Sequence, residues 1–431
     1  MTRRIFNSIM VISILLFSCK KDKDDVKPLI TVTAPTTNQQ INGIDTIQVL
    51  AAISDDRNIE TVRVSLRNDD DIPVLSTIIK QPNTKNYDLH TFYFFDDIHL
   101  PSGFYYFDIS ASDGENTAHV FIDVLLNEVP KARNGIFIFS NTGSISDIYV
   151  LDNNYNGTYY NSLSGDYLGS AVNSYDQQLV HASGITGSIS TIDLKTGGMY
   201  WNIPIVNTPP TPYYTGFLYD HENIFMGLRN GNVQGYDKNG AANYSAVANS
   251  GYYVESVHIH NDDYLVTEQH AVSSSAVQLV LYWTASGAQV QQATINEDIK
   301  GIYSRTANQI VLLTNDASSM GKLIFYDIPS GLTSSPFSIG VAQIDDCVEI
   351  STGIYLVAEG GNVTLINANN FSTLPYLTGV GANKLKYDEL TDELFVVSGN
   401  SLSAYSYTSK SLKGNYTNPN NILGVDFWYN K

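Results

Sequence analysis

The most regular pattern in the sequence is a short apolar strand that ends at a polar residue and is followed by a turn. The turn contains glycine in most copies, and the next copy follows after about 40 residues. Seven copies lie between residues 147 and 411: DIYVLDNNYNG, SISTIDLKTGG, NVQGYDKNGAA, QLVLYWTASGA, KLIFYDIPSGL, NVTLINANNFS and SLSAYSYTSKS. Such spacing predicts an array of similar β units that bury their apolar faces against one another.

A second β run precedes most of the copies. These runs are QQLVHA, NIFMGL, DYLVTE, QIVLLT, IYLVAE and ELFVVS. A period of about 40 residues with four strands in each is typical of a β-propeller. The first repeat, which contains GIFIFSN, has no innermost strand, whereas ILGVDFWYNK at the C-terminus has that pattern and no repeat of its own. We therefore expect residues 133–431 to form a seven-bladed β-propeller that is closed by its C-terminal strand.

Residues 28–128 have a different strand pattern without this repeat. LITVTAP alternates apolar and polar positions, and LPSGFYYFDISASDGENTAHVFIDVLL predicts a hairpin that turns at Asp113 and Gly114. Two further strands are expected on either side of a turn at Ser54–Asn58. The stretches AAISDDRNIETVRV and LPSGFYYFDISASDG resemble immunoglobulin-like and cadherin-like modules, which implies a two-sheet β-sandwich that serves as a spacer. Asp55, Asp56 and Asp113 fit ordinary turn chemistry, with calcium ligation as the alternative.

The first residues combine two arginines, Arg3 and Arg4, with the apolar run Ile9–Phe17, which is too short to span a bilayer. Residues 1–18 are thus expected to be a signal peptide. Leu16, Ser18 and Cys19 resemble the lipobox of bacterial lipoproteins, which implies that Cys19 is the acylated first residue of the mature chain. The segment 19–27 would be a tether. Its lysine- and aspartate-rich start resembles the surface-export signal of Bacteroidetes lipoproteins, and a plain solvated tether is the alternative.

The net charge and the cysteines limit the partners and the chemistry that can be expected of this chain. The formal net charge is −19 and the pI is about 4.6, so the surface repels phosphate backbones and nucleic acid is not expected as a partner. The chain contains two cysteines, and Cys347 lies in the alternating run QIDDCVEI, where a buried and unreactive thiol is expected.

One of the seven repeats resembles a known blade motif more closely than the others do. STIDLKTGGMYW is similar to the blade motif of quinoprotein-like and YVTN-like propellers, where the motif is structural. Redox quinoproteins commonly carry a vicinal cysteine pair beside their cofactor, and this chain has none. We therefore expect no cofactor. His258 and His260 share one side of a strand, but spacing gives them no third ligand, so no metal is expected either.

Ligands of propellers usually bind at the mouth of the central channel, where the innermost strands begin. Counting back from the second strand of each repeat places one residue of each blade there. The predicted ligand-binding residues are Tyr214, Tyr253, Glu255, Lys300, Asp345 and Lys384, with Gly169 and Gly424 at small positions. The charges alternate in sign, so the alternatives are a ring of salt bridges and a site for a polar ligand.

The function expected from these features is the binding of a glycan or a protein at the cell envelope, without catalysis, by a lipid-anchored outer-membrane protein. No catalytic motif occurs in a fitting context. Two alternatives stay open. One is a glycoside hydrolase or lyase that uses carboxylates such as Glu255, Asp345 and Asp346, and the other is a scaffold for envelope assembly.

Overall fold

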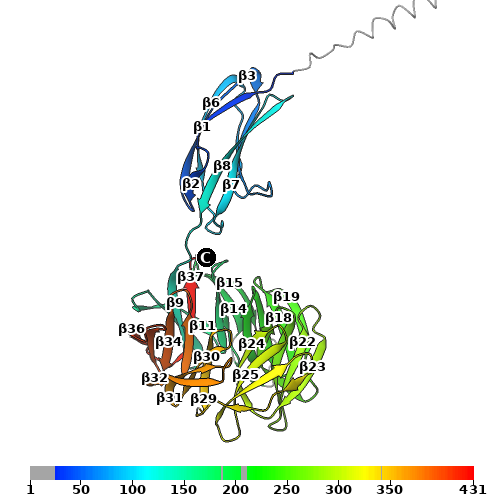
Figure 1. Ribbon diagram of the computed structural model, residues 1–431, viewed down its shortest axis with the longest axis vertical. Coiled ribbons are helices and arrows are strands. Elements are labelled where there is room, and N and C mark those ends of the chain that lie inside the picture. The colour runs from blue at the N-terminus through cyan, green and yellow to red at the C-terminus, as the bar shows by residue number, and fades with distance from the viewer. Residues whose placement is uncertain (1–24, 186–187, 205–210, 341) are drawn as a thin grey trace, which may run out of the picture. The chain divides into compact units, whose positions relative to one another are not determined.

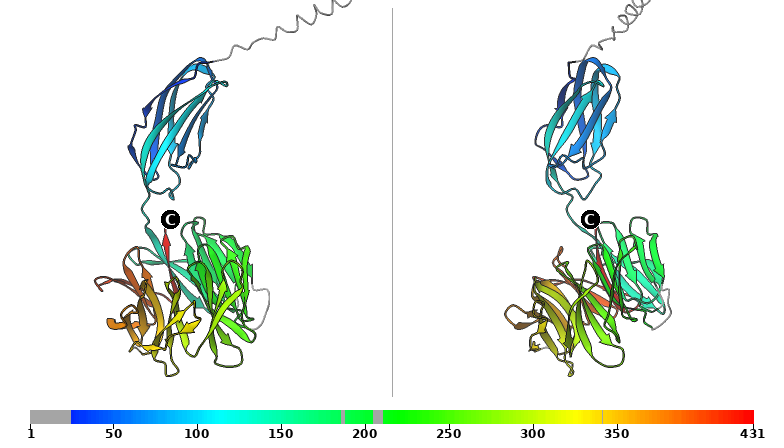
Figure 2. Two further views of the ribbon diagram at one scale, coloured as in Figure 1. Left: turned by 45° about the vertical axis from the view of Figure 1, so that its right-hand side comes forward. Right: turned by 90° about the vertical axis from the view of Figure 1, so that its right-hand side faces the viewer.

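The computed structural model describes residues 25–185, 188–204, 211–340 and 342–431 (Figures 1 and 2). All regular elements in these ranges are β-strands, and they include no helix with the length and apolar character needed to cross a membrane. The expected signal peptide, Cys19 and the start of the tether lie outside the described residues. The contacts within the chain divide it into two compact units, residues 1–130 and 131–431.

The first unit consists of two sheets with the strand orders β1-β3-β6 and β2-β8-β7-β4-β5. β2 pairs with β8 in parallel, and the other pairs are antiparallel. Its strands are β1 (Leu29–Ala34), β2 (Gln39–Asn42), β3 (Thr46–Ile59), β4 (Thr61–Arg67), β5 (Ile78–Lys80), β6 (Thr84–Phe94), β7 (Gly103–Ser112) and β8 (Thr117–Asn127).

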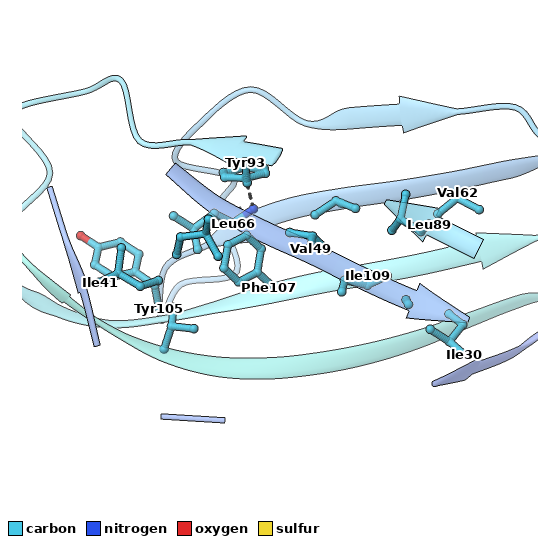
Figure 3. Packing of buried hydrophobic residues seen from close by; sticks show 14 of the residues in the cluster. Ile30, Ile41, Val49, Val62, Leu66, Leu89, Tyr93, Tyr105, Phe107 and Ile109 are labelled. Carbon is cyan, nitrogen blue, oxygen red and sulfur yellow. Dashed lines mark hydrogen bonds between the residues drawn. The ribbon is translucent and has the colours of Figure 1, made fainter. Parts of the chain in front are cut away.

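The core of the first unit lies between these two sheets (Figure 3). Alternate residues of β3, such as Val49 and Ile53, are buried against Phe107 and Ile109 of β7, as the period of two requires. The Tyr93 hydroxyl accepts a hydrogen bond of 3.2 Å from the Leu66 backbone N–H inside this core. The predicted hairpin at Asp113 and Gly114 is confirmed by the antiparallel pairing of β7 with β8.

The turn expected at Ser54–Asn58 is not formed. β3 continues through these residues to Ile59, and its pairing with β6 jumps from Ser54 to Ile59. β4 then pairs with β7 in the other sheet. The polar residues therefore mark a bulge at which the chain passes from one sheet to the other, and sequence alternation alone does not distinguish such a bulge from a turn.

The second unit contains seven antiparallel sheets among the described residues, each with four strands or, in one sheet, five. In sheet order from the innermost strand, they are β37 (Ile422–Tyr429), β9 (Arg133–Thr142), β10 (Ile145–Leu151), β11 (Gly157–Ser164); β12 (Gly169–Asn173), β13 (Gln178–Ala182), β14 (Ser188–Asp193), β15 (Met199–Pro204); β16 (Tyr214–Asp220), β17 (Asn223–Leu228), β18 (Asn232–Asp237), β19 (Ala242–Val247); β20 (Tyr252–His260), β21 (Tyr264–Ala271), β22 (Val277–Trp283), β23 (Gln289–Ile295); β24 (Asp298–Thr306), β25 (Gln309–Asn315), β26 (Gly321–Asp327), β27 (Leu332–Thr333), β28 (Phe337–Ser338); β29 (Ile344–Ser351), β30 (Ile354–Glu359), β31 (Gly361–Asn367), β32 (Ser372–Ala382); and β33 (Lys384–Asp388), β34 (Glu393–Ser398), β35 (Ser401–Ser406), β36 (Leu412–Thr417).

The second strand of each sheet is buried on both faces, which explains its continuous apolar sequence. In β25, for example, Ile310 to Leu313 are all fully buried, because the two faces of this sheet pack against the sheets on either side. Each innermost strand contacts the innermost strands of both neighbouring sheets, and β33 contacts β37, so these strands form a closed ring.

The two ends of the second unit meet in one sheet. β37 pairs with β9, with Val425 opposite Ile138 and Phe427 opposite Ile136, as expected from the sequence. The apolar residues of β37 pack on Phe395 of β34 in the preceding sheet. The C-terminal strand therefore joins the last sheet to the first and covers an edge that would otherwise be open.

A buried ionic network fixes the same junction. The Arg133 guanidinium lies 2.8 Å from Asp388 and 2.6 Å from Glu393, and these three side chains are at most 4% exposed. Tyr155 donates a hydrogen bond to Glu393, and Tyr429 of β37 donates one to Asp388. Burial alone would raise the pKa of Glu393, but hydrogen bonds from Lys413 and Arg133 outweigh it, so this pKa is lowered.

Cys347 is a free thiol on β29. Its Sγ donates a 3.2 Å hydrogen bond to the Lys300 carbonyl oxygen, and burial, aided by the negative charge of Asp346, raises the pKa of the thiol to about 12.

We expect iodoacetamide at pH 8 to alkylate Cys347 at least roughly 100-fold more slowly in the folded protein than in urea, because the thiolate is the reactive form. Mass spectrometry of the Cys347 peptide over time gives both rates. Equal rates would show that this thiol is accessible and easily ionised.

Candidate functional site

Five of the seven innermost strands have a bulge one to three residues after they begin. The register with the second strand shifts at this point in β16, β20, β24, β29 and β37. The extra residues are Thr215, Glu255, Lys300, Asp345 and Leu423. A bulge changes the direction of its side chain, so these five residues are oriented differently from their neighbours near the start of the innermost strands.

Three of the six predicted residues, Glu255, Lys300 and Asp345, occupy these bulges. The prediction is wrong by one residue in β16, where the bulge residue is Thr215. Tyr214 is 2% exposed and packs with Met226 in the core between sheets. The reason is that β16 has one residue fewer between its bulge and β17. Its turn after Asp220 has two residues, whereas the turn after β20 has three and β24 and β29 each contain a second bulge.

Tyr253 and Glu255 belong to a charged cluster on β20 and β21. The Glu268 carboxylate is 3% exposed and accepts hydrogen bonds of 2.7 Å from Ser256 and His270. The Tyr253 ring lies under the Arg229 guanidinium, 3.6 Å from it, and 5.8 Å from the His270 ring.

The pKa values in this cluster are shifted in a consistent way. Glu255 is exposed to solvent, yet the surrounding side chains remove part of its hydration, which raises its pKa; His270 and Arg229 oppose this increase and Glu268 adds to it. The hydrogen bond to Glu268 raises the pKa of His270 despite its partial burial. The cluster therefore favours a protonated imidazole next to a carboxyl group with a weakened tendency to ionise.

The four predicted charges do not form a ring of salt bridges with one another. Lys300 pairs with Asp298 at 2.7 Å, and among the described residues no ion pair joins Glu255, Asp345 or Lys384 to any partner. Alternating sign along the sequence therefore did not predict which of these charges form ion pairs.

The channel contains two cavities, of about 400 Å³ and about 190 Å³. The smaller one lies near the start of the innermost strands, where Gly169, Lys384 and Gly424 line it. The larger one extends towards their other end. The residues that line both cavities are Ser170, Phe217, Lys386 and Asp426. These four side chains therefore lie where the two cavities meet.

A chain of polar contacts crosses this meeting point. The Lys386 ammonium lies 3.1 Å from the Asp426 carboxylate, which also accepts a short hydrogen bond from Ser170. The hydroxyls of Ser170 and Tyr167 are 2.8 Å apart. Asp426 is 6% exposed, so its charge is held by these donors rather than by bulk water.

Lys386, Ser170 and Asp426 were not predicted as site residues. Each lies one or two positions beyond a predicted channel position, namely Gly169, Lys384 or Gly424. A strand presents alternate residues to one side, so Lys386 could have been inferred from Lys384 by the period of two. The contact between Ser170 and Asp426 can be recognised only once β12 and β37 are known to be neighbours.

The abundant tyrosines mostly pack between sheets rather than forming a surface. Tyr282, Tyr326 and Tyr355 are almost fully buried. Tyr219 and Tyr429 line the larger cavity together with Phe217 and Phe427. Aromatic side chains reach the smaller cavity as well, where Tyr167 and Phe217 line it.

His258 and His260 face one neighbour, as expected for residues two apart on a strand. Their ring nitrogens lie 3.1 Å and 2.9 Å from the Ser304 hydroxyl of β24.

A different group of possible metal ligands, Asp220, His221 and Asp262, lies on two exposed turns with its ligand atoms within 4.8 Å of one another. His221 and Asp220 already hydrogen-bond each other at 2.7 Å, so these turns need no ion to satisfy them.

Radial antiparallel sheets around a channel, closed by pairing of the two chain ends, make this unit a β-propeller. No protein-family model and no curated protein matches the sequence. Among solved structures, the computationally designed Ika8 protein aligns with a TM-score of 0.46 at 10% identity, over 68% of this chain and 91% of that chain. The Cps50 (Swd1) β-propeller domain of Myceliophteria thermophila aligns with a TM-score of 0.47 at 12% identity, over 61% of this chain and 90% of that chain.

Proposed function

We propose that the protein is a lipid-anchored outer-membrane protein that carries an immunoglobulin-like spacer and a seven-bladed propeller. The sheet pairing in each unit and the seven sheets of the second unit support the two architectures. The lipobox-like Leu16, Ser18 and Cys19 support the anchor, and the lysine- and aspartate-rich segment after Cys19 supports exposure at the cell surface.

The function that we propose for the propeller is the binding of a glycan in its channel, without catalysis. The cavity of about 400 Å³ carries this proposal, because it combines Ser170, Lys386 and Asp426 with the rings of Phe217 and Tyr429. Its size is that of a small-molecule site, and a few directed polar groups among apolar walls are typical of such sites. The hydroxyls of a sugar can hydrogen-bond to these polar groups, and its C–H face can pack on the aromatic rings.

The same geometry favours a glycan over a folded protein as the ligand. A specific protein interface buries roughly 800 Å² on each partner, which requires a broad surface rather than a channel of a few hundred cubic ångströms. The two carboxylates that line the cavities, Asp426 and Asp346, already accept hydrogen bonds from Lys386 and from the Leu385 backbone N–H. This arrangement suits fixed ligand orientation more than proton transfer.

The proposal is tested by a glycan array with the full mature chain, in which Cys19→Ser prevents acylation. We expect binding to a restricted set of glycans and its loss in Ala171→Trp, which fills the larger cavity that Ala171 lines. Lys195→Gln on an exposed turn is the control, and it leaves binding unchanged. Binding of no glycan, together with recovery of a defined protein partner, would replace this function by scaffolding.

A glycoside hydrolase is the second candidate, and the cluster around Glu255 favours it. A carboxyl group with a raised pKa beside a second carboxylate, Glu268, is the combination that acid-catalysed glycoside cleavage uses. Incubation of each array ligand with the protein, followed by chromatography of the products, distinguishes the two functions. Cleavage that is lost in Glu255→Gln would establish hydrolysis, and intact ligand after long incubation would support binding alone.

A further inference from the structure

The smaller cavity brings two lysines, Lys384 and Lys386, together with two aspartates, Asp346 and Asp426. Lys384 and Lys386 are two residues apart on β33 and both line this cavity. Lys386 is paired with Asp426, whereas Lys384 is exposed and forms no ion pair with any described residue. One lysine is therefore neutralised and the other is available to a ligand.

The remaining acidic group of this cavity, Asp346, forms no ion pair with Lys384 or with any other residue that the structure describes. Asp346 accepts a 2.7 Å hydrogen bond from the Leu385 backbone N–H, and burial raises the pKa of its carboxyl group. The other walls include Phe217, Val397 and Val425, which exclude water without adding charge. A concave site with low-dielectric walls concentrates the field of a single unpaired cation, so Lys384 acts more strongly here than a lysine on a convex surface.

Glycines give this cavity its shape. A Cβ atom at Gly169 would lie 2.5 Å from the Phe217 ring, and one at Gly424 would overlap the Tyr167 hydroxyl. Both glycines thus let aromatic rings lie directly against the innermost strands β12 and β37. The cavity of about 190 Å³ that remains has room for one sugar unit next to the two lysines.

We propose that the anionic group of an acidic glycan, a carboxylate or a sulfate ester, binds between Lys384 and Lys386. This inference rests on the proposed glycan binding and adds the chemical class of the ligand. The acidic sugar unit occupies the smaller cavity, and its neutral neighbour extends past Ser170 and Asp426 into the larger one. The two lysines act as point charges, so they accept either oxyanion.

The test compares probes that differ in charge alone. Oligogalacturonate and its fully methyl-esterified form are titrated calorimetrically into the mature chain, and a sulfated galactan oligomer with its desulfated form makes a second pair. We expect the charged member of at least one pair to bind roughly 10-fold or more tightly than its neutral form, and to weaken as salt is added. The pair that shows the difference identifies carboxylate or sulfate as the group.

Variants connect this difference to the two lysines. Lys384→Gln is expected to weaken binding of the charged probe roughly 10-fold with little change in the unfolding temperature, since Lys384 is exposed and forms no ion pair with a described residue. Lys195→Gln removes the same charge from an exposed turn and is expected to change nothing. Tighter binding of the neutral probes, with no effect of Lys384→Gln, would overturn the anionic subsite and leave glycan binding intact. Absence of binding across these probes and the glycan array would overturn both.

Discussion

Replacing Arg133 by methionine is expected to lower the free energy of unfolding of the propeller by about 3–5 kcal/mol. Among the described residues, Arg133 is the only cation that pairs with both Asp388 and Glu393, and both carboxylates are almost fully buried. The substitution leaves them without that charge in a site from which water is excluded. Because Tyr429 of β37 donates to Asp388, the loss also loosens the junction between the last sheet and the first.

Urea unfolding followed by tryptophan fluorescence measures this loss in the propeller alone, since Trp201, Trp283 and Trp428 all belong to the second unit. The matched control is Lys413→Met. Lys413 lies 2.7 Å from the same Glu393, but its side chain is 42% exposed, so we expect a loss of about 1 kcal/mol or less. Equal losses in both variants would show that the burial of the Arg133 network has no special role.

Replacing His181 by phenylalanine is expected to stabilise the protein and to remove part of its sensitivity to acid. His181 is 1% exposed, and neither ring nitrogen has a hydrogen-bond partner among the described residues. Its ring lies 6.3 Å from that of Phe139 and 5.9 Å from that of Tyr167. An apolar ring of similar shape avoids the cost of burying two unsatisfied nitrogens, so at pH 7 we expect a gain of about 1–3 kcal/mol.

The acid effect follows from the direction of the pKa shift. Burial lowers the pKa of His181 to about 4 from an ordinary value of 6.5, so the unfolded chain binds a proton between these pH values and the folded chain does not. Stability therefore falls as the pH decreases from 6.5 to 4, by about 3 kcal/mol from this residue. Urea unfolding at pH 7 and pH 4 should show a wild-type loss that exceeds the variant's by this amount.

His221→Gln is the control for this prediction. His221 is exposed, and its hydrogen bond to Asp220 raises its pKa. Its contribution to stability is therefore present at low pH and is lost as the pH rises, which is opposite to the effect of His181. Parallel losses of stability in wild type and His181→Phe would contradict the assignment of His181 as a buried neutral imidazole.

The repeat pattern predicted the strands of the propeller well because both faces of these strands are buried. QIVLLT and ELFVVS fall within β25 and β34, and ILGVDFWY forms β37. Their apolar character is dictated by packing between neighbouring sheets, so it is readable without tertiary information. In the first unit, the same reasoning placed a turn at Ser54–Asn58, where β3 instead bulges and continues.

The site was less predictable, because its geometry depends on bulges and on strands that are distant in sequence. In β16 the shorter turn before β17 moves the bulge to Thr215, and Tyr214 lies in the core. The contact between Lys386 and Asp426 joins β33 to β37, and Ser170 reaches the same carboxylate from β12. No spacing in the sequence relates these three residues, and only the closed ring of innermost strands brings them together.

The central claim is that a glycan binds inside the propeller channel. A crystal structure of the mature chain with the glycan that binds most tightly on the array tests it most directly. We predict density for a sugar between Lys386, Asp426 and Phe217, with an acidic group next to Lys384. An empty channel with the sugar bound on the outer edges of the sheets would contradict the account.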